Sequence, residues 1–263
     1  MNTTEEQLLA QIWERPDDRA ALSVYADWLV EQGSERGQYM QLWLLEKPTS
    51  AQLRLRDWLL LEHQEAWLGP ARPFIGRWIE SAASPGFFAH VTCTADNLAR
   101  GFDQIRALGP RLQVAIEPAR NSYDTLIALG KTPLGKLHRL ELYEDARREW
   151  LTDEFLFHLG PALAGLRSLA FHSLEGVATL DAWQRLLPYL SSVERLDLTI
   201  GDPPKDWVAS LLASPLIKTL ERLSVPDWVE PEQRAQLQAA MAGRELAFRR
   251  ENRRFPEIPV PVG

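Results

Sequence analysis

The chain has 263 residues, of which 45% are hydrophobic and 25% are charged, and its formal net charge is −7. These values are typical of a globular protein with one large domain or two modest ones. The negative charge argues against a general nucleic-acid binder, which normally presents a basic face. The N-terminus lacks a signal-peptide pattern, and apolar stretches fall short of the roughly 20 residues that span a bilayer. We therefore expect a cytoplasmic protein without membrane insertion.

Residues 3–46 predict three short helices, because their apolar residues recur at helical spacing in three runs. Pro16 and Gly33 separate these runs; proline cannot continue a helix, and glycine readily takes the left-handed conformation that ends one. Asp17 or Asp18 is in place to cap the second helix.

A longer helix is predicted from about 51 to 67, after a turn at 47–50 and before Gly69. It would connect the short helices to the rest of the chain. Its candidate buried positions are Leu53, Trp58, Leu59, Leu61 and Leu68.

From about residue 86 short apolar strands alternate with helical patterns. Four of the strands share a template with a central leucine, and these leucines are separated by 29, 27 and 27 residues. A strand and a helix repeated at this interval are the signature of a leucine-rich repeat solenoid, with parallel strands inside and helices outside. The predicted strands are 88–93, 112–116, 137–142, 166–171, 193–198 and 220–225, and a final helix is predicted over 231–249.

Alternate residues of these strands would face outward onto a concave sheet, where equivalent positions form ladders about 4.8 Å apart. Arginine recurs at one such position, with an acid one step along two of the strands. Such a ladder can grip an acidic or mixed-charge partner. The alternative is that the charges pair with each other and only solvate the sheet. The candidate partner contacts are Arg139, Glu141, Tyr143, His172, Arg195, Asp197 and Arg222.

The sequence offers little support for catalysis. It contains no HExxH, GxSxG or P-loop motif, and no glycine-rich dinucleotide fingerprint. The single cysteine, Cys93, excludes an internal disulfide or a Cys-based zinc site and falls on an inward-facing strand position. We expect no catalytic residue, no cofactor and no metal, so an enzyme with an unrecognised site is a remote alternative.

The stretch from Tyr25 to Leu29 reads YADWL and is followed by Gly33, Arg36 and Gly37. Within it, Asp27 is either a catalytic acid or a structural fastener. Its place off the apolar stripe favours a fastener that accepts hydrogen bonds from Arg36 or from the start of the third helix. Gly33 would supply the chain reversal and Gly37 a close approach of two helices.

This pattern resembles the N-terminal repeat-companion domain of bacterial proteins. Such modules typically precede repeat arrays, often leucine-rich, so the resemblance implies architecture and an interaction role, and it supplies no site residues. The expected organisation is a helical module at 1–47, a connecting helix and cap at 48–85, repeats at 86–248 and a Pro-rich tail at 249–263.

The expected function is therefore the binding of another protein, as an interaction or scaffold protein, through the concave face of the repeats. The alternative is an assembly adaptor in which the acidic module at 1–47 makes the contact with a second copy or a dedicated partner.

Overall fold

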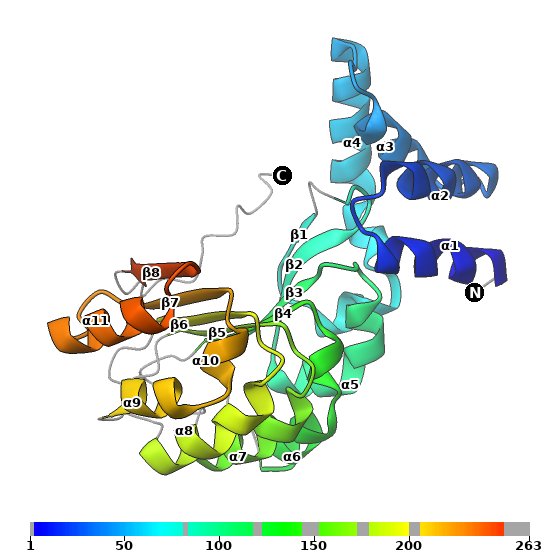
Figure 1. Ribbon diagram of the computed structural model, residues 1–263. Helices are drawn as coiled ribbons and strands as arrows, with labels where there is room; N and C mark the ends of the chain where they lie inside the picture. The colour runs from blue at the N-terminus through cyan, green and yellow to red at the C-terminus, as the bar shows by residue number, and fades with distance from the viewer. Residues whose placement is uncertain are drawn as a thin grey trace. The chain divides into compact units, whose positions relative to one another are not determined.

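The chain has an α/β fold, with an eight-stranded, mostly parallel sheet whose strands lie in chain order (Figure 1). It divides into two compact units. Among the described residues, the first comprises those up to Val91 and 103–112, and the second comprises 92–102 and those from Gln113 onward. The computed structural model describes residues 3–80, 84–117, 123–143, 153–172, 179–199 and 206–249.

Helices dominate the start of the first unit, as the sequence predicts. Asp18 caps the second helix by accepting hydrogen bonds from the backbone N–H groups of Ala20 and Ala21. The unit is not wholly helical, because a short strand missed by the sequence analysis, β1 (Trp78–Glu80), pairs antiparallel with β2 (Phe88–Cys93). The helices are α1 (Thr3–Glu14), α2 (Arg19–Glu31), α3 (Glu35–Leu44), α4 (Ser50–Trp67) and the 3-10 helix η1 (Gly69–Phe74).

The core of the first unit gathers around Phe87. Its ring stacks on Tyr25 at 6.0 Å between centroids and meets Trp13 edge-on at 5.6 Å. Apolar and aromatic side chains from α1 to α4 complete this core, so the short helices share one hydrophobic cluster. Its buried members are Ile12, Leu22, Tyr25, Ala26, Leu29, Tyr39, Met40, Leu59 and Phe87.

Two glycines shape the turn between α2 and α3, and both predictions about them are confirmed. Gly33 has φ +74°, a left-handed conformation that reverses the chain after α2. A Cβ atom on Gly37 would lie 2.6 Å from the backbone N of Val30 and 2.7 Å from Cβ of Leu29. Gly37 therefore allows α3 to approach α2 more closely than any other residue would.

We expect Gly37→Ala to lower the free energy of unfolding by about 1–3 kcal/mol, because overpacking against backbone outweighs the gain in helix propensity. Urea denaturation of the two chains measures the difference. Gln38→Ala is the matched control, since Gln38 is the exposed next residue of the same helix. Equal stability of wild type and Gly37→Ala would contradict the close approach.

Asp27 and Arg36 do not form the predicted contact with each other. Asp27 is exposed and accepts a hydrogen bond of 2.6 Å from Nε2 of Gln41 on α3. Nε of Arg36 instead donates to the carbonyl of Gly86 at 2.7 Å. Asp27 thus still links α2 to α3, but through an exposed polar pair that contributes little to stability.

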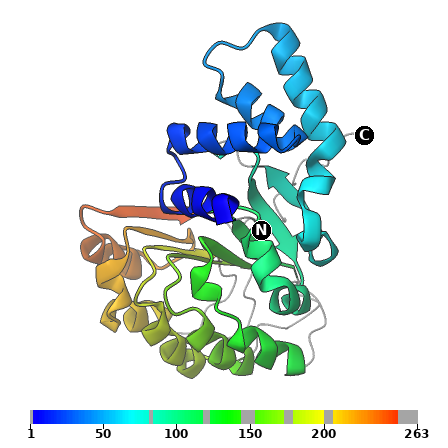
Figure 2. The same ribbon diagram turned by 90° about the vertical axis from the view of Figure 1, so that its right-hand side faces the viewer.

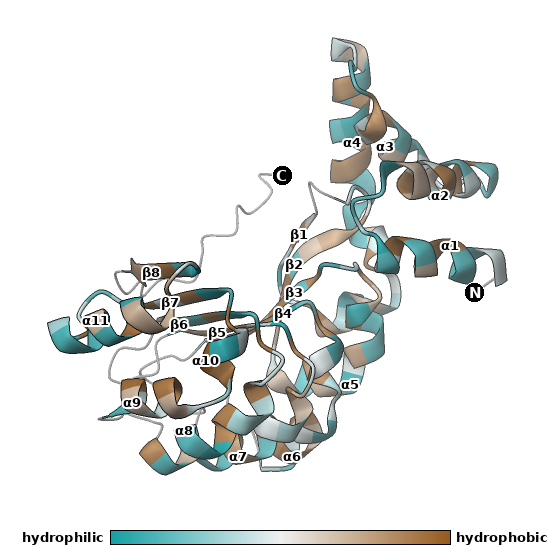
Figure 3. Cartoon of the chain, viewed as in Figure 1, coloured by the Kyte–Doolittle hydropathy of each residue, from teal (hydrophilic) through white to brown (hydrophobic). Residues whose placement is uncertain are grey.

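One side of the connecting helix α4 is more exposed than predicted. Leu59 and Leu68 are buried, with 2% and 1% exposure, as predicted. Trp58 and Leu61 are 53% and 61% exposed, because α4 packs on α3 along one face only. Figure 3 shows polar and apolar bands alternating along this helix.

The second unit repeats a strand and a helix along the chain. The central leucines of four strands, Leu140, Leu169, Leu196 and Leu223, are at most 1% exposed. Figures 1 and 2 show α6 to α9 side by side along one side of the strands. The strands are β3 (Gln113–Ile116), β4 (Arg139–Tyr143), β5 (Ser168–His172), β6 (Arg195–Thr199), β7 (Arg222–Pro226) and β8 (Glu245–Arg249).

Short helical segments connect these strands. A further helix, α5 (Ala95–Arg106), follows β2. Among the described residues, no helix combines the length and the apolar character that crossing a bilayer requires. The remaining segments are α6 (Tyr123–Lys131), η2 (Leu134–Lys136), α7 (Asp153–Ala162), α8 (Leu180–Leu186), η3 (Leu187–Leu190), α9 (Trp207–Ala213) and α10 (Leu216–Thr219).

The predicted final helix over 231–249 is wrong in its second half. The helix α11 (Pro231–Ala240) ends early, Gly243 takes φ +79°, and residues 245–249 form β8. This strand pairs parallel with β7, and Leu246 lies beside Leu223. The Pro-rich tail from residue 250 onward lies outside the described residues.

Candidate functional site

The strands of the second unit place the predicted contact residues in rows across one face of the sheet. Parallel pairing sets Gln113 beside Arg139, Ser168 beside Arg195, and Arg195 beside Arg222. The register therefore matches the predicted ladder. We call this surface the sheet face; its members include Gln113, Arg139, Arg195, Arg222 and Glu245 in one row, Ala115, Glu141, Ala170, Asp197 and Ser224 in the next, and Tyr143 and His172 in the third.

The sheet face is less exposed than the strand pattern predicts. Glu141 and Tyr143, which alternation places on an outward face, are each only 7% exposed. Ser224 is 1% exposed, whereas Arg195 lies open to solvent. Glu141 and Tyr143 are therefore corrected from open contact candidates to buried members of the face.

Glu141 is the centre of a buried polar cluster. Its Oε1 accepts a hydrogen bond of 2.6 Å from Nε of Arg139, and its Oε2 accepts one of 2.8 Å from the hydroxyl of Tyr143. Arg139 also donates from Nη1 to Oγ of Ser168 on the next strand, at 3.2 Å. One carboxylate thus ties together side chains of β4, and Arg139 extends the cluster to β5.

His172 completes this cluster. Its ring stacks on Tyr143 with the centroids 4.3 Å apart and the planes inclined by 20°. Its Nε2 is buried, lies 3.6 Å from Oε2 of Glu141 and makes no hydrogen bond with the described residues. Because that separation exceeds a normal hydrogen bond, Arg139 is the firmer partner of the carboxylate.

The surroundings shift the pKa values of Glu141 and Tyr143 in opposite directions. Burial by itself raises the pKa of Glu141, but His172 and Arg139 outweigh it and hold the pKa well below its usual range. Burial raises the pKa of Tyr143, and the neighbouring carboxylate raises it further. The cluster therefore holds an ionised carboxylate and a neutral phenol across the physiological pH range, which is a structural arrangement more than an acid–base pair.

The other charges of the sheet face are only partly paired. Nε of Arg222 lies 3.2 Å from Oε1 of Glu245 on β8, and Nη1 of Arg249 lies 3.8 Å from Oδ2 of Asp197. Arg195 makes no ion pair or hydrogen bond through its side chain within the described ranges. Arg195 is thus an exposed cation in the middle of a row.

Two further features bear on catalysis. Burial, and then the charge of Glu117, raise the pKa of Cys93, so the neutral thiol dominates and the group is a poor nucleophile. The described part of the chain contains no group of three or more His, Cys, Asp or Glu side chains that could hold a metal ion.

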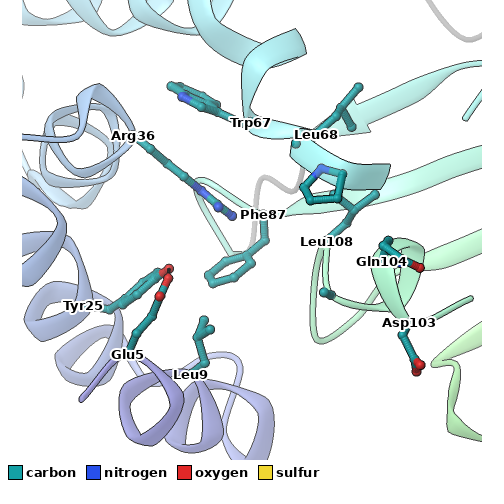
Figure 4. A pocket seen from close by; sticks show the side chains of 13 residues that line it. Glu5, Leu9, Tyr25, Arg36, Trp67, Leu68, Phe87, Asp103, Gln104 and Leu108 are labelled. Carbon is teal, nitrogen blue, oxygen red and sulfur yellow. Dashed lines mark hydrogen bonds between the residues drawn. The ribbon is translucent and has the colours of Figure 1, made fainter. Parts of the chain in front are cut away.

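The first unit contains a pocket of about 420 Å³ that the sequence analysis missed (Figure 4). The guanidinium of Arg36 lies 5.0 Å from the centre of the Phe87 ring, and the hydroxyl of Tyr25 lies 3.5 Å from Oε1 of Glu5. Burial raises the pKa of Tyr25, so its hydroxyl stays neutral. Apolar walls with a few polar groups suit a ligand with an apolar body and one polar end. The lining includes Leu9, Trp67, Leu68, Pro70, Asp103, Gln104 and Leu108.

No sequence motif predicts this pocket. Its lining residues come from α1, α2, α3, the end of α4, the turn before β2 and the end of α5. The only local signal is Arg36, which follows the YADWL stretch and was predicted to donate a hydrogen bond to Asp27. Side chains so far apart in sequence meet only through tertiary packing.

Known proteins supply no relative from which a site could be transferred: no family model, curated protein or solved structure matches the chain. The resemblance to the repeat-companion domain therefore stays a prediction. The functional argument rests on the chain's own residues.

Proposed function

We propose that this chain is a non-enzymatic interaction protein, that its second unit is a short leucine-rich repeat solenoid, and that the sheet face binds another protein. Support for the repeat architecture comes from parallel strands in chain order, with equivalent leucines buried at intervals of 27 to 29 residues. Each strand and helix repeat would bury its hydrophobic side against the neighbouring repeats, which leaves the sheet face for a partner.

The observation that carries the binding proposal is the exposed arginine row. Arg195 is open and unpaired among the described residues, and Arg222 lies beside it in register with a side chain that is 39% exposed and paired with Glu245 at 3.2 Å. Guanidinium groups bind carboxylates through two parallel hydrogen bonds. The partner surface that fits this row is therefore an acidic segment of a protein.

The buried cluster beside the row supports a rigid platform. Arg139 is held by Glu141 and by Ser168, so its position is fixed before any partner arrives. Fixed groups lose less conformational freedom on binding than mobile ones. We assign recognition to Arg195 and Arg222, and support to the Arg139 cluster.

The proposal predicts that Arg195→Ala combined with Arg222→Ala strongly reduces partner capture without unfolding the chain. Tagged full-length chain is immobilised, native cell extract is passed over it, and the retained proteins are quantified by mass spectrometry. We expect a true partner to be retained at least about tenfold less by the variant, since two charge-assisted contacts are lost.

The matched control is Arg100→Ala with Arg185→Ala, which removes two exposed arginines from helix surfaces, where each pairs with a carboxylate four residues away. This control should retain the partner. Capture that is equal in wild type, variant and control, with unchanged melting temperatures, would contradict binding by the sheet face.

A further inference from the structure

Helix α4 presents an apolar stripe that is largely open among the described residues of the first unit; its central side chain, Trp58, has an edge-on ring contact with His63 of the same helix, at 5.9 Å between centroids. Leu55, Trp58 and Leu61 are 45%, 53% and 61% exposed. They are three residues apart, so with 100° per residue they fall within about 60° of one line along the helix. Single exposed apolar residues are ordinary, but a contiguous stripe with a large aromatic at its centre marks an interaction surface.

Other positions of α4 are already packed within the unit. Leu59 is buried in the core cluster, and Trp67 packs against Tyr39 at 5.2 Å between ring centroids. The guanidinium of Arg56 lies 5.8 Å from the Trp43 ring centre on α3. The stripe is therefore not part of the unit's own core.

Two charges flank the stripe in a symmetric way. Arg54 precedes Trp58 by four residues and Glu62 follows it by four, so both lie on the same side of the helix as the stripe. Both are exposed, and neither has an ion pair among the described residues. Leu55 and Leu61 are likewise placed three residues before and after Trp58. The surface is thus self-complementary about Trp58.

We infer that this stripe is a docking surface for a second copy of the chain, with the two α4 helices antiparallel about a twofold axis at Trp58. In that arrangement Leu55 of each copy contacts Leu61 of the other copy. Arg54 of each copy likewise lies opposite Glu62 of the other copy. A twofold interface uses the same patch on both copies, as this pattern requires. Parallel helices would place Arg54 against Arg54 and are disfavoured.

This contact lies outside the sheet face and does not depend on the proposed partner binding. A single helix pair buries less than the ~1,200–2,000 Å² of a stable interface, so we expect a weak dimer with a dissociation constant of about 10–100 μM. Both charge pairs lie at its rim, so added salt weakens the dimer.

The test uses charge reversal on the full-length chain, measured by sedimentation velocity over a concentration range that spans this dissociation constant. Arg54→Glu places like charges opposite each other, as does Glu62→Arg, and each variant alone should be monomeric. An equimolar mixture of the two variants should dimerise again, because each Glu then faces an Arg. The double variant Arg54→Glu/Glu62→Arg should dimerise on its own.

Glu31→Arg is the control, since Glu31 is an exposed acid on α2, and it should dimerise like wild type. Circular dichroism confirms that each variant is folded. Wild type that stays monomeric throughout the range would overturn the inference. Variants that dimerise as wild type does, or a mixture that fails to recover, would assign the contact to another surface or to a different partner.

Discussion

Replacing Glu141 with alanine is expected to lower the free energy of unfolding by about 3 kcal/mol, the lower end of the range for breaking a buried ion pair. The substitution removes the carboxylate that accepts hydrogen bonds from both Nε of Arg139 and the hydroxyl of Tyr143. Arg139, with a side chain only 22% exposed, would keep its charge without that carboxylate. Urea denaturation at neutral pH measures the loss.

Glu194→Ala is the matched control for this prediction. Its carboxylate pairs with Arg167 at 3.0 Å, but those side chains are 36% and 72% exposed. An exposed pair of this kind contributes about 0–1 kcal/mol. Equal losses for Glu141→Ala and Glu194→Ala would contradict a buried cluster at Glu141.

The same carboxylate gives stability a defined pH dependence. The folded pKa of Glu141 lies below its unfolded value, so its contribution is fully present above the unfolded pKa of about 4.3 and is lost as pH falls below it. The difference in unfolding free energy between wild type and Glu141→Gln should therefore be largest near neutral pH and shrink in acid. A difference that grows as the pH falls would refute the lowered pKa.

The repeats of the second unit were accessible to sequence analysis because each strand carries the same local pattern. Central leucines at a nearly constant interval fix both the strands and their register, and Leu140 does lie beside Leu169. The two strands at the ends of the sheet, β1 and β8, were not predicted, and the reasons differ. β1 is only three residues long, and the segment that forms β8 reads as a continuation of α11 because Gly243 is the only break in the pattern.

The sequence predicted which side chains share the sheet face, but it did not predict how deeply they are buried. Alternation along a strand tells which side chains share a face, and it placed Arg139, Glu141 and His172 correctly together. It does not tell what lies over that face, so the burial of Glu141 had no local signal. The pocket around Phe87 and the open stripe on α4 depend on which elements pack together, and periodicity alone marked Trp58 as a core residue.

Gly135→Ala should be the most disruptive addition of a single methyl group in the second unit, lowering the free energy of unfolding by about 3 kcal/mol or more. A Cβ atom at Gly135 would lie 1.9 Å from the carbonyl oxygen of Ala164 and 2.8 Å from its carbonyl carbon. These are backbone atoms, which cannot move aside by changing a rotamer. The methyl group must therefore displace a turn.

The turn in question precedes β5 and has the same hydrogen bond as the turn before β4. The N–H of Leu137 donates to the carbonyl of Leu134 at 2.9 Å, and 29 residues later the N–H of Leu166 donates to the carbonyl of Leu163 at 2.9 Å. Equivalent turns thus stack on each other as closely as glycine allows. Pushing them apart would also strain the pairing of the two strands that follow.

Gly243→Ala separates this clash from ordinary backbone strain. Gly243 has φ +79° but no atom within 4 Å of its added Cβ, so its substitution costs only the left-handed conformation, about 1–2 kcal/mol. Urea denaturation of both variants gives the comparison. If Gly135→Ala proves no more destabilising than Gly243→Ala, the turns are not in contact; if it is at least about 1 kcal/mol worse, tight stacking of successive turns holds the second unit together.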